Sequence, residues 1–144
     1  MLMNKSEIEG KIPHAGAMCL LDGVVAWDAT KIRCVTRTHQ NENNPMRANG
    51  QLSAVCGVEY AAQAMAIHGG LTVVAGKRPQ AGYLASLRDV VCHRGRLDDL
   101  EHELVVEAEQ LMGDETRVIY QFALRAGEAE LLSGRATVVL DAGG

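Results

Sequence analysis

The segment 51–70, QLSAVCGVEYAAQAMAIHGG, constrains the fold most strongly, because a helix this apolar must lie against other parts of the protein. Its central part carries a single charged side chain, Glu59, among small and apolar neighbours. A Gly-Gly pair near its end is typical of a helix terminus, and Ser53 suits the position that caps a helix start. We therefore predict a buried helix over residues 53–68.

The segments around this helix have the composition of β-strands separated by short turns such as GDE and GE. Residues 31–39 show the alternation clearly, because Ile32 and Cys34 point to one side while Lys31 and Arg33 point to the other. One long buried helix with several strands predicts an α+β fold in which a curved antiparallel sheet wraps around the helix. The predicted strands are 17–27, 31–39, 81–95, 102–113, 116–127 and 129–141.

Two further segments are predicted to lack strands. Residues 1–11 have the character of a short polar lead-in, and residues 40–50, QNENNPMRANG, are rich in Asn, Pro and Gly and predict a loop. The length of 144 residues is typical of one domain, residues 1–144.

Charge and cysteine content exclude several classes of protein. A net charge of −4 argues against a nucleic-acid surface, which needs a basic patch. Four cysteines without a CxxC motif, in a chain without a signal peptide, predict reduced thiols and a cytoplasmic protein. No apolar run has membrane-spanning length, and the His and Cys residues lack metal-ligand spacing, so we expect no membrane insertion, no metal and no cofactor.

The predicted helix gathers its polar groups on one stripe. At 100° per residue, one face carries Cys56, Glu59, Tyr60 and Gln63. The start of the helix also offers free backbone N–H groups at Ala54 and Val55, which can hold a developing oxyanion. The residue pattern leaves two interpretations open. Either Glu59 has a structural role, in which it pairs with a buried arginine or caps a loop, or it takes part in chemistry in a cleft.

Three motifs together resemble the β-hydroxyacyl-[acyl-carrier-protein] dehydratases. They are IPHAGAMCLLDGVVAWD at 12–28, GVEYAAQAMA at 57–66 and GYLASLRDVVCHRGRLDDLEHELVVEAEQ at 82–110. The resemblance extends over residues 12–140 and is greatest to the dehydratase-like subgroup associated with aryl polyene synthesis. It implies a hotdog fold, a dimer, and two active sites at the dimer interface.

Dehydration of a β-hydroxyacyl thioester needs a base for the α proton, donors for the carbonyl oxygen, and an acid for the departing hydroxyl. The resemblance implies a histidine as the base, the carboxyl of Glu59 as the acid or water-holding group, and backbone N–H groups at the helix start as donors. The family's loop position for that histidine is occupied here by Pro45-Met46. Either a partner subunit supplies the base, another residue such as His39 replaces it, or the chain is a non-catalytic subunit.

The resemblance also implies partners. An acyl carrier protein with a phosphopantetheine-linked substrate is acidic, and Arg88, Arg94 and Arg96 are candidates for its contact surface. We expect Gln63, Arg94 and Arg96 to bind substrate, with an apolar acyl tunnel beside Glu59 that opens near these two arginines. We expect a dimer, either of identical chains or with a His-bearing hotdog subunit. A hotdog thioesterase, in which Glu59 activates water, and a non-catalytic acyl-binding or scaffold subunit are the alternatives.

Overall fold

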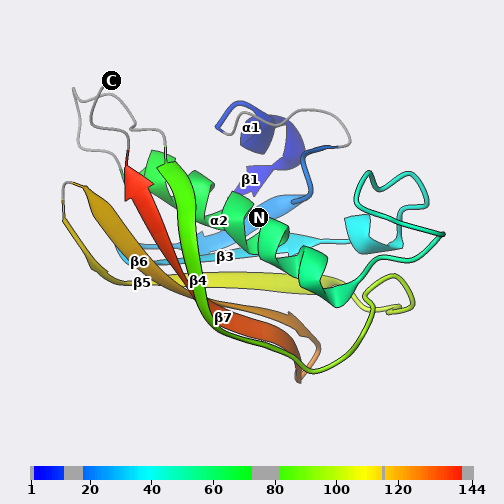
Figure 1. Cartoon of the computed structure of the whole chain (residues 1–144). Helices are drawn as coiled ribbons and strands as arrows, with labels where there is room; N and C mark the ends of the chain where they lie inside the picture. Colours follow the sequence, from blue (N-terminus) through cyan, green and yellow to red (C-terminus); the bar gives the residue numbers. More distant parts are fainter. Residues whose placement is uncertain (1, 12–17, 73–81, 115, 141–144) are drawn as a thin grey trace.

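The computed structural model describes residues 2–11, 18–72, 82–114 and 116–140 (Figure 1). Its described strands form one antiparallel sheet of seven strands in the order β1-β2-β3-β5-β6-β7-β4. The strands are β1 (Met3–Asn4), β2 (Gly23–Trp27), β3 (Lys31–Thr36), β4 (Gly82–Cys92), β5 (Leu104–Gly113), β6 (Arg117–Ala126) and β7 (Ala129–Leu140).

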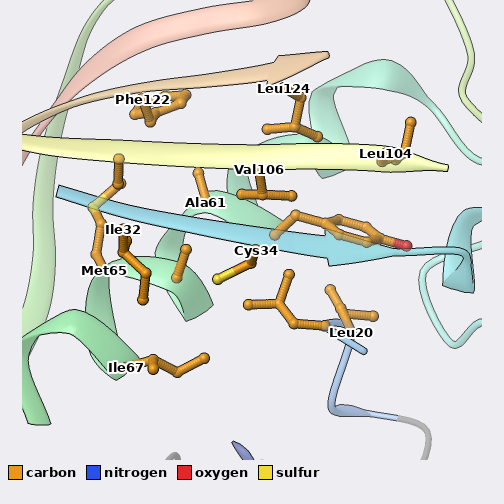
Figure 2. Close-up of a cluster of buried hydrophobic side chains, with 14 of the residues drawn as sticks. Leu20, Ile32, Cys34, Ala61, Met65, Ile67, Leu104, Val106, Phe122 and Leu124 are labelled. Carbon is orange, nitrogen blue, oxygen red and sulfur yellow. The ribbon is translucent and has the colours of Figure 1, made fainter. Parts of the chain in front are cut away.

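The apolar segment forms the long helix α2 (Gly57–Leu71), which follows a single 3₁₀ turn at Ala54–Cys56. Helix α2 lies along one face of the curved sheet and packs against β3, β5 and β6 (Figure 1). The core fills the space between them, with Ala61 and Met65 of the helix facing Ile32, Val106 and Phe122 of the strands (Figure 2). The predicted arrangement of a helix wrapped by an antiparallel sheet is therefore confirmed.

A glycine lets the start of α2 approach the sheet closely. A Cβ atom at Gly57 would lie 2.7 Å from a methyl carbon of Leu132 and 2.9 Å from one of Leu124. Any larger residue would push the helix away from β6 and β7. This close approach fixes the position of the residues that follow, including Glu59.

The structure corrects the predicted element boundaries in several places. The lead-in forms β1 and a short helix α1 (Lys5–Glu9), whose capping box joins Asn4 and Glu7. The strand predicted from residue 17 begins only at Gly23, and Thr38–Gln40 forms a 3₁₀ turn instead of strand. Helix α2 is buried on one side only, because its opposite side leaves several small residues accessible to solvent. No helix in the described part of the chain is long and apolar enough to cross a membrane.

Strand β4 forms one edge of the sheet and leaves apolar side chains uncovered. Leu84 and Leu87 pair with Val138 and Ala136 of β7 on the face that bears α2. The helix packs against β3, β5 and β6 and therefore does not cover these leucines. These two leucines are 43% and 41% exposed, and Val90 and Val91 are also exposed. Only β7 pairs with β4 among the described strands, so an apolar strand edge is open to a partner.

A buried hydrogen-bond network ties α2 to the segment that follows β3. The hydroxyl of Tyr60 accepts a hydrogen bond from Asn44 Nδ2 and bonds Thr38 Oγ1, each at 2.9 Å. Thr38 Oγ1 donates its own proton to the carbonyl of Leu20 at 2.6 Å, so the Tyr60 hydroxyl donates to Thr38. Burial raises the pKa of Tyr60, which keeps this donor protonated.

Tyr60→Phe is expected to lower the free energy of unfolding by about 1–3 kcal/mol, because it leaves buried donors and acceptors without a partner. Urea unfolding measures this loss. Ser53→Ala is the matched control, since Ser53 makes no side-chain capping bond and its loss should change stability by less than about 0.5 kcal/mol. Equal stability of the Tyr60→Phe variant and the unmodified chain would contradict a stabilising network.

Candidate active site

Glu59 lies in the first turn of α2, half-buried, where the helix start also favours a negative charge. Its Oε1 lies 3.5 Å from Nε2 of Gln63, so the two residues share one face of the helix as the sequence spacing predicts. The carboxyl is therefore held at the edge of the core without being sealed inside it. This placement is compatible with contact to a substrate.

Gln63 is 2% exposed and its amide is engaged on both sides. Its Oε1 accepts the N–H of Leu20 at 2.9 Å, and its Nε2 donates to the carbonyl of Met18 at 2.9 Å. Gln63 therefore links α2 to residues 18–20 and orients Glu59. Its amide is already engaged, so the predicted contact between Gln63 and substrate is wrong.

The start of the helix retains one of the two predicted backbone donors. The N–H of Ala54 donates to the carbonyl of Gly95 at 3.0 Å, so the expectation of a free donor there is wrong. The N–H of Cys56 donates to Ser53. The N–H of Val55 donates to no turn, loop or side-chain acceptor in the described ranges, and the Val55 side chain is 57% exposed. Val55 is thus the donor that could hold a carbonyl oxygen.

The loop that holds the helix start contains a residue that the sequence analysis did not single out. Asp98 has a 5% exposed side chain, accepts the N–H of Leu52 at 2.8 Å, and forms an ion pair with Arg96. Its bond to Arg96 holds the pKa of the Asp98 carboxyl far below its ordinary value. A backbone bridge between Ser53 and Arg96 completes this junction. The loop thereby determines which helix-start donors remain available.

The two arginines predicted to bind substrate are instead paired within this loop. Arg94 Nη2 bonds Asp99 Oδ1 at 2.7 Å and its Nε donates to the carbonyl of Arg96 at 2.8 Å. Asp98 neutralises Arg96 in the same way. Their charges are matched by neighbouring aspartates, so each attracts an acidic carrier or a phosphate less than an unpaired arginine would.

Met46 occupies the loop position where the family resemblance implies a catalytic histidine. It is half-buried, and its carbonyl accepts a hydrogen bond from the thiol of Cys56 at 3.9 Å, one turn before Glu59. Burial raises the pKa of the Cys56 thiol, which therefore stays protonated and is not a nucleophile at neutral pH. The loop position thus lies beside the helix start, as the resemblance requires, but it carries a side chain that cannot accept a proton.

The described histidines do not replace the missing base. His39 is fully buried, and its Nε2 is bonded to the carbonyl of Leu100 at 3.1 Å. It cannot reach a substrate, so the expectation that His39 could replace the base is wrong. His68 is also fully buried between Tyr120 and the carbonyl of Asp28. The exposed histidines are His93, which pairs with Glu130, and His102. His14 lies outside the described residues.

His39 gives stability a pH dependence. Burial, and to a lesser extent the nearby Arg37 and Arg47, lower its pKa below the ordinary value of about 6.5. As pH falls below that value, the unfolded chain binds a proton that the folded chain resists. We expect the free energy of unfolding to fall by at most about 1.4 kcal/mol per pH unit from this residue. Urea unfolding between pH 7.5 and 5.5 measures the slope.

The variants that test this slope are His39→Gln and His102→Gln. The first removes the buried imidazole and should flatten the curve, while the second alters an exposed histidine and should leave it unchanged. A His39→Gln protein with the same pH slope as the unmodified chain would show that another group is responsible.

One pocket among the described residues lies away from Glu59. It has a volume of about 400 Å³ and lies on the sheet face opposite α2. Its rim includes Trp27, Lys31, Arg33, Glu107, Glu109 and Arg125. This location gives no support to an acyl tunnel beside Glu59 within one chain. Among the described residues, no group of His, Cys, Asp and Glu side chains could hold a metal.

Taken together, the described part of the chain presents half of an acid–base site. Glu59 provides a carboxyl and Val55 an N–H donor at the start of one helix, while Met46 occupies the neighbouring loop. Such a site can donate a proton and stabilise a carbonyl oxygen. It requires a base from elsewhere to remove a proton from carbon.

Solved structures with the same architecture confirm the hotdog fold. One chain of the ApeI:P dehydratase heterocomplex from Xenorhabdus doucetiae has a TM-score of 0.82 at 19% identity, over 93% of this chain and 90% of that chain. A thioesterase variant from Pseudomonas aeruginosa gives 0.68 at 13% identity, over 95% and 93%. A thioesterase from Haemophilus influenzae gives 0.68 at 14% identity, over 98% and 95%. At such identities the likeness concerns the fold alone.

Sequence comparison assigns the family. No curated protein sequence matches the chain. The model of the ApeP-like family, the ApeP dehydratases, matches residues 6–142, which is nearly the full length. The match confirms the resemblance drawn from the three motifs and includes the helix with Glu59. The chain belongs to the ApeP-like dehydratase family.

Proposed function

We propose that this chain is one subunit of a heteromeric dehydratase that converts β-hydroxyacyl thioesters on acyl carrier protein into enoyl thioesters. In this proposal Glu59 is the acid that protonates the departing hydroxyl, and the Val55 N–H holds the thioester oxygen. A His-bearing hotdog partner supplies the base.

The observation that carries the proposal is that Glu59 stands at the helix start while Met46 occupies the loop position beside it. The helix start thus carries a carboxyl, whereas the thioether at the loop position cannot accept a proton. Both accessible described histidines, His93 and His102, lie outside helix α2 and its leading turn. The described residues therefore offer no base to complete an acid–base pair with Glu59, and we assign the base to a second chain. The likeness to a chain of the ApeI:P heterocomplex supports a heteromeric partner.

The open edge of β4 is the surface that we propose for this partner. An antiparallel strand added there would satisfy the free backbone groups, and the partner's core would cover Leu84 and Leu87. The acyl chain would then bind between the two subunits.

A pull-down from the native host tests this proposal. Tagged chain should recover a second hotdog protein that carries a histidine in the loop before its long helix, identified by mass spectrometry. Recovery of identical chains alone would contradict the heteromeric proposal. Release of free thiol from an acyl thioester by the recovered complex would indicate a thioesterase, because dehydration leaves the thioester intact.

A further inference from the structure

A row of charged and polar side chains crosses the sheet face opposite α2 and ends at the open edge. Register pairs connect Lys31 to Glu109, Glu109 to Gln121, Gln121 to Arg135, and Arg135 to Arg88. Directly opposite residues of an antiparallel pair project from the same face of the sheet. The row therefore ends in two adjacent arginines, of which Arg88 stands on the edge strand β4.

These two arginines differ from the other charged pair of the row, Lys31 and Glu109. Lys31 bonds Glu109 at 3.2 Å, whereas Arg88 and Arg135 form no ion pair with any residue in the described ranges. Both are exposed. Like charges placed directly opposite each other destabilise a sheet. The cost is removed when a carboxylate comes to lie beside them.

The position of Arg88 along β4 makes this pair sensitive to the choice of partner. Strand β4 runs from Gly82 to Cys92, so Arg88 lies next to its midpoint. If two copies of the chain paired along β4, a two-fold axis at the midpoint would bring both Arg88 side chains to diagonal positions, about 7–8 Å apart on one face. With Arg135 from each copy, four arginines would share one row.

We infer that Arg88 and Arg135 disfavour pairing of this chain with its own copy and favour a different hotdog chain whose facing strand carries a carboxylate beside Arg88. The inference rests on the proposed heteromeric pairing along β4 and specifies the chemistry of that partner. The arginines lie on an open sheet face outside the lining of the described pocket, so a protein surface suits them better than a small anion.

Arg88→Glu turns the chain itself into a carboxylate-bearing partner and so provides the test. Unmodified chain and the Arg88→Glu variant are mixed in equal amounts, and native mass spectrometry counts the three kinds of dimer. Random pairing gives as many mixed dimers as dimers of like chains, and we expect this ratio to rise by about twofold to fivefold in favour of the mixed dimers. The excess should appear in about 0.1 M ammonium acetate and vanish in about 1 M, where charges are screened over about 3 Å.

Lys11→Glu is the control, because it makes the same change of charge at an exposed residue after α1, at the opposite end of the sheet. Its mixture should pair at random. The inference is overturned if Arg88→Glu pairs at random, if it forms no dimer with the unmodified chain, or if Lys11→Glu shows the same excess. The readout involves neither activity nor the native partner, so such a result would leave the dehydratase proposal standing.

Discussion

Glu59→Gln in this chain, assayed in the complex with its His-bearing partner, is expected to slow dehydration by about 10²–10⁴-fold. The substitution keeps the size of the side chain and its capacity to hydrogen-bond Gln63, but it removes the titratable proton. Because the proposed role is protonation of the departing hydroxyl, the loss should appear in kcat. The measurement is conversion of a β-hydroxyacyl carrier-protein thioester into its enoyl form.

Glu42→Gln is the matched control, since Glu42 is an exposed acid in the loop before α2. It should keep the full rate. Thermal unfolding of both variants verifies that the fold is intact. Full activity of the Glu59→Gln complex would instead make Glu59 a structural residue that orients Gln63 and the segment from Met18 to Leu20.

Phe122→Ala is expected to lower the free energy of unfolding by about 3–5 kcal/mol. The ring is 1% exposed and lies in the layer between α2 and the sheet, beside Ala61 and Met65 (Figure 2). It is the sole Phe of the chain, whose aromatic content is 3%, so few other side chains can fill the space it leaves. Urea unfolding at pH 7.5 measures the loss.

Gln121→Ala serves as its neighbour control. Gln121 precedes Phe122 on β6 but is exposed on the opposite face of the sheet, so its truncation should change stability by less than about 0.5 kcal/mol. Similar losses for both variants would mean that the two faces of β6 are equally packed, contrary to the architecture described.

The sequence predicted the central features of the fold because they depend on local pattern. The apolar helix and the strands that follow it carry periodicities that a chain of this length can satisfy only by burying them together. The helical carboxyl at Glu59 and its neighbour Gln63 were predicted from spacing alone, and the structure places them within 3.5 Å. The capped turn of α1 was missed, although Asn4 and Glu7 carry the spacing of a capping box.

The details of the site depend on contacts that sequence spacing does not encode. The N–H of Ala54 is occupied by Gly95, and Gln63 by residues more than 40 positions away, so their roles follow from tertiary packing. The role of Asp98 likewise depends on a tertiary contact, because its carboxyl accepts the N–H of Leu52 just before the helix start. The adjacency of Arg88 and Arg135 follows from the register of β4 against β7, which short patterns do not fix.

The most direct test of the account compares three preparations on one β-hydroxyacyl carrier-protein thioester: this chain alone, the His-bearing partner alone, and their complex. Met46 stands where a base is needed, so we predict that this chain alone is at least about 100-fold slower than the complex. Enoyl product formed by the isolated chain at the rate of the complex would contradict the account, because it would place a base within this chain.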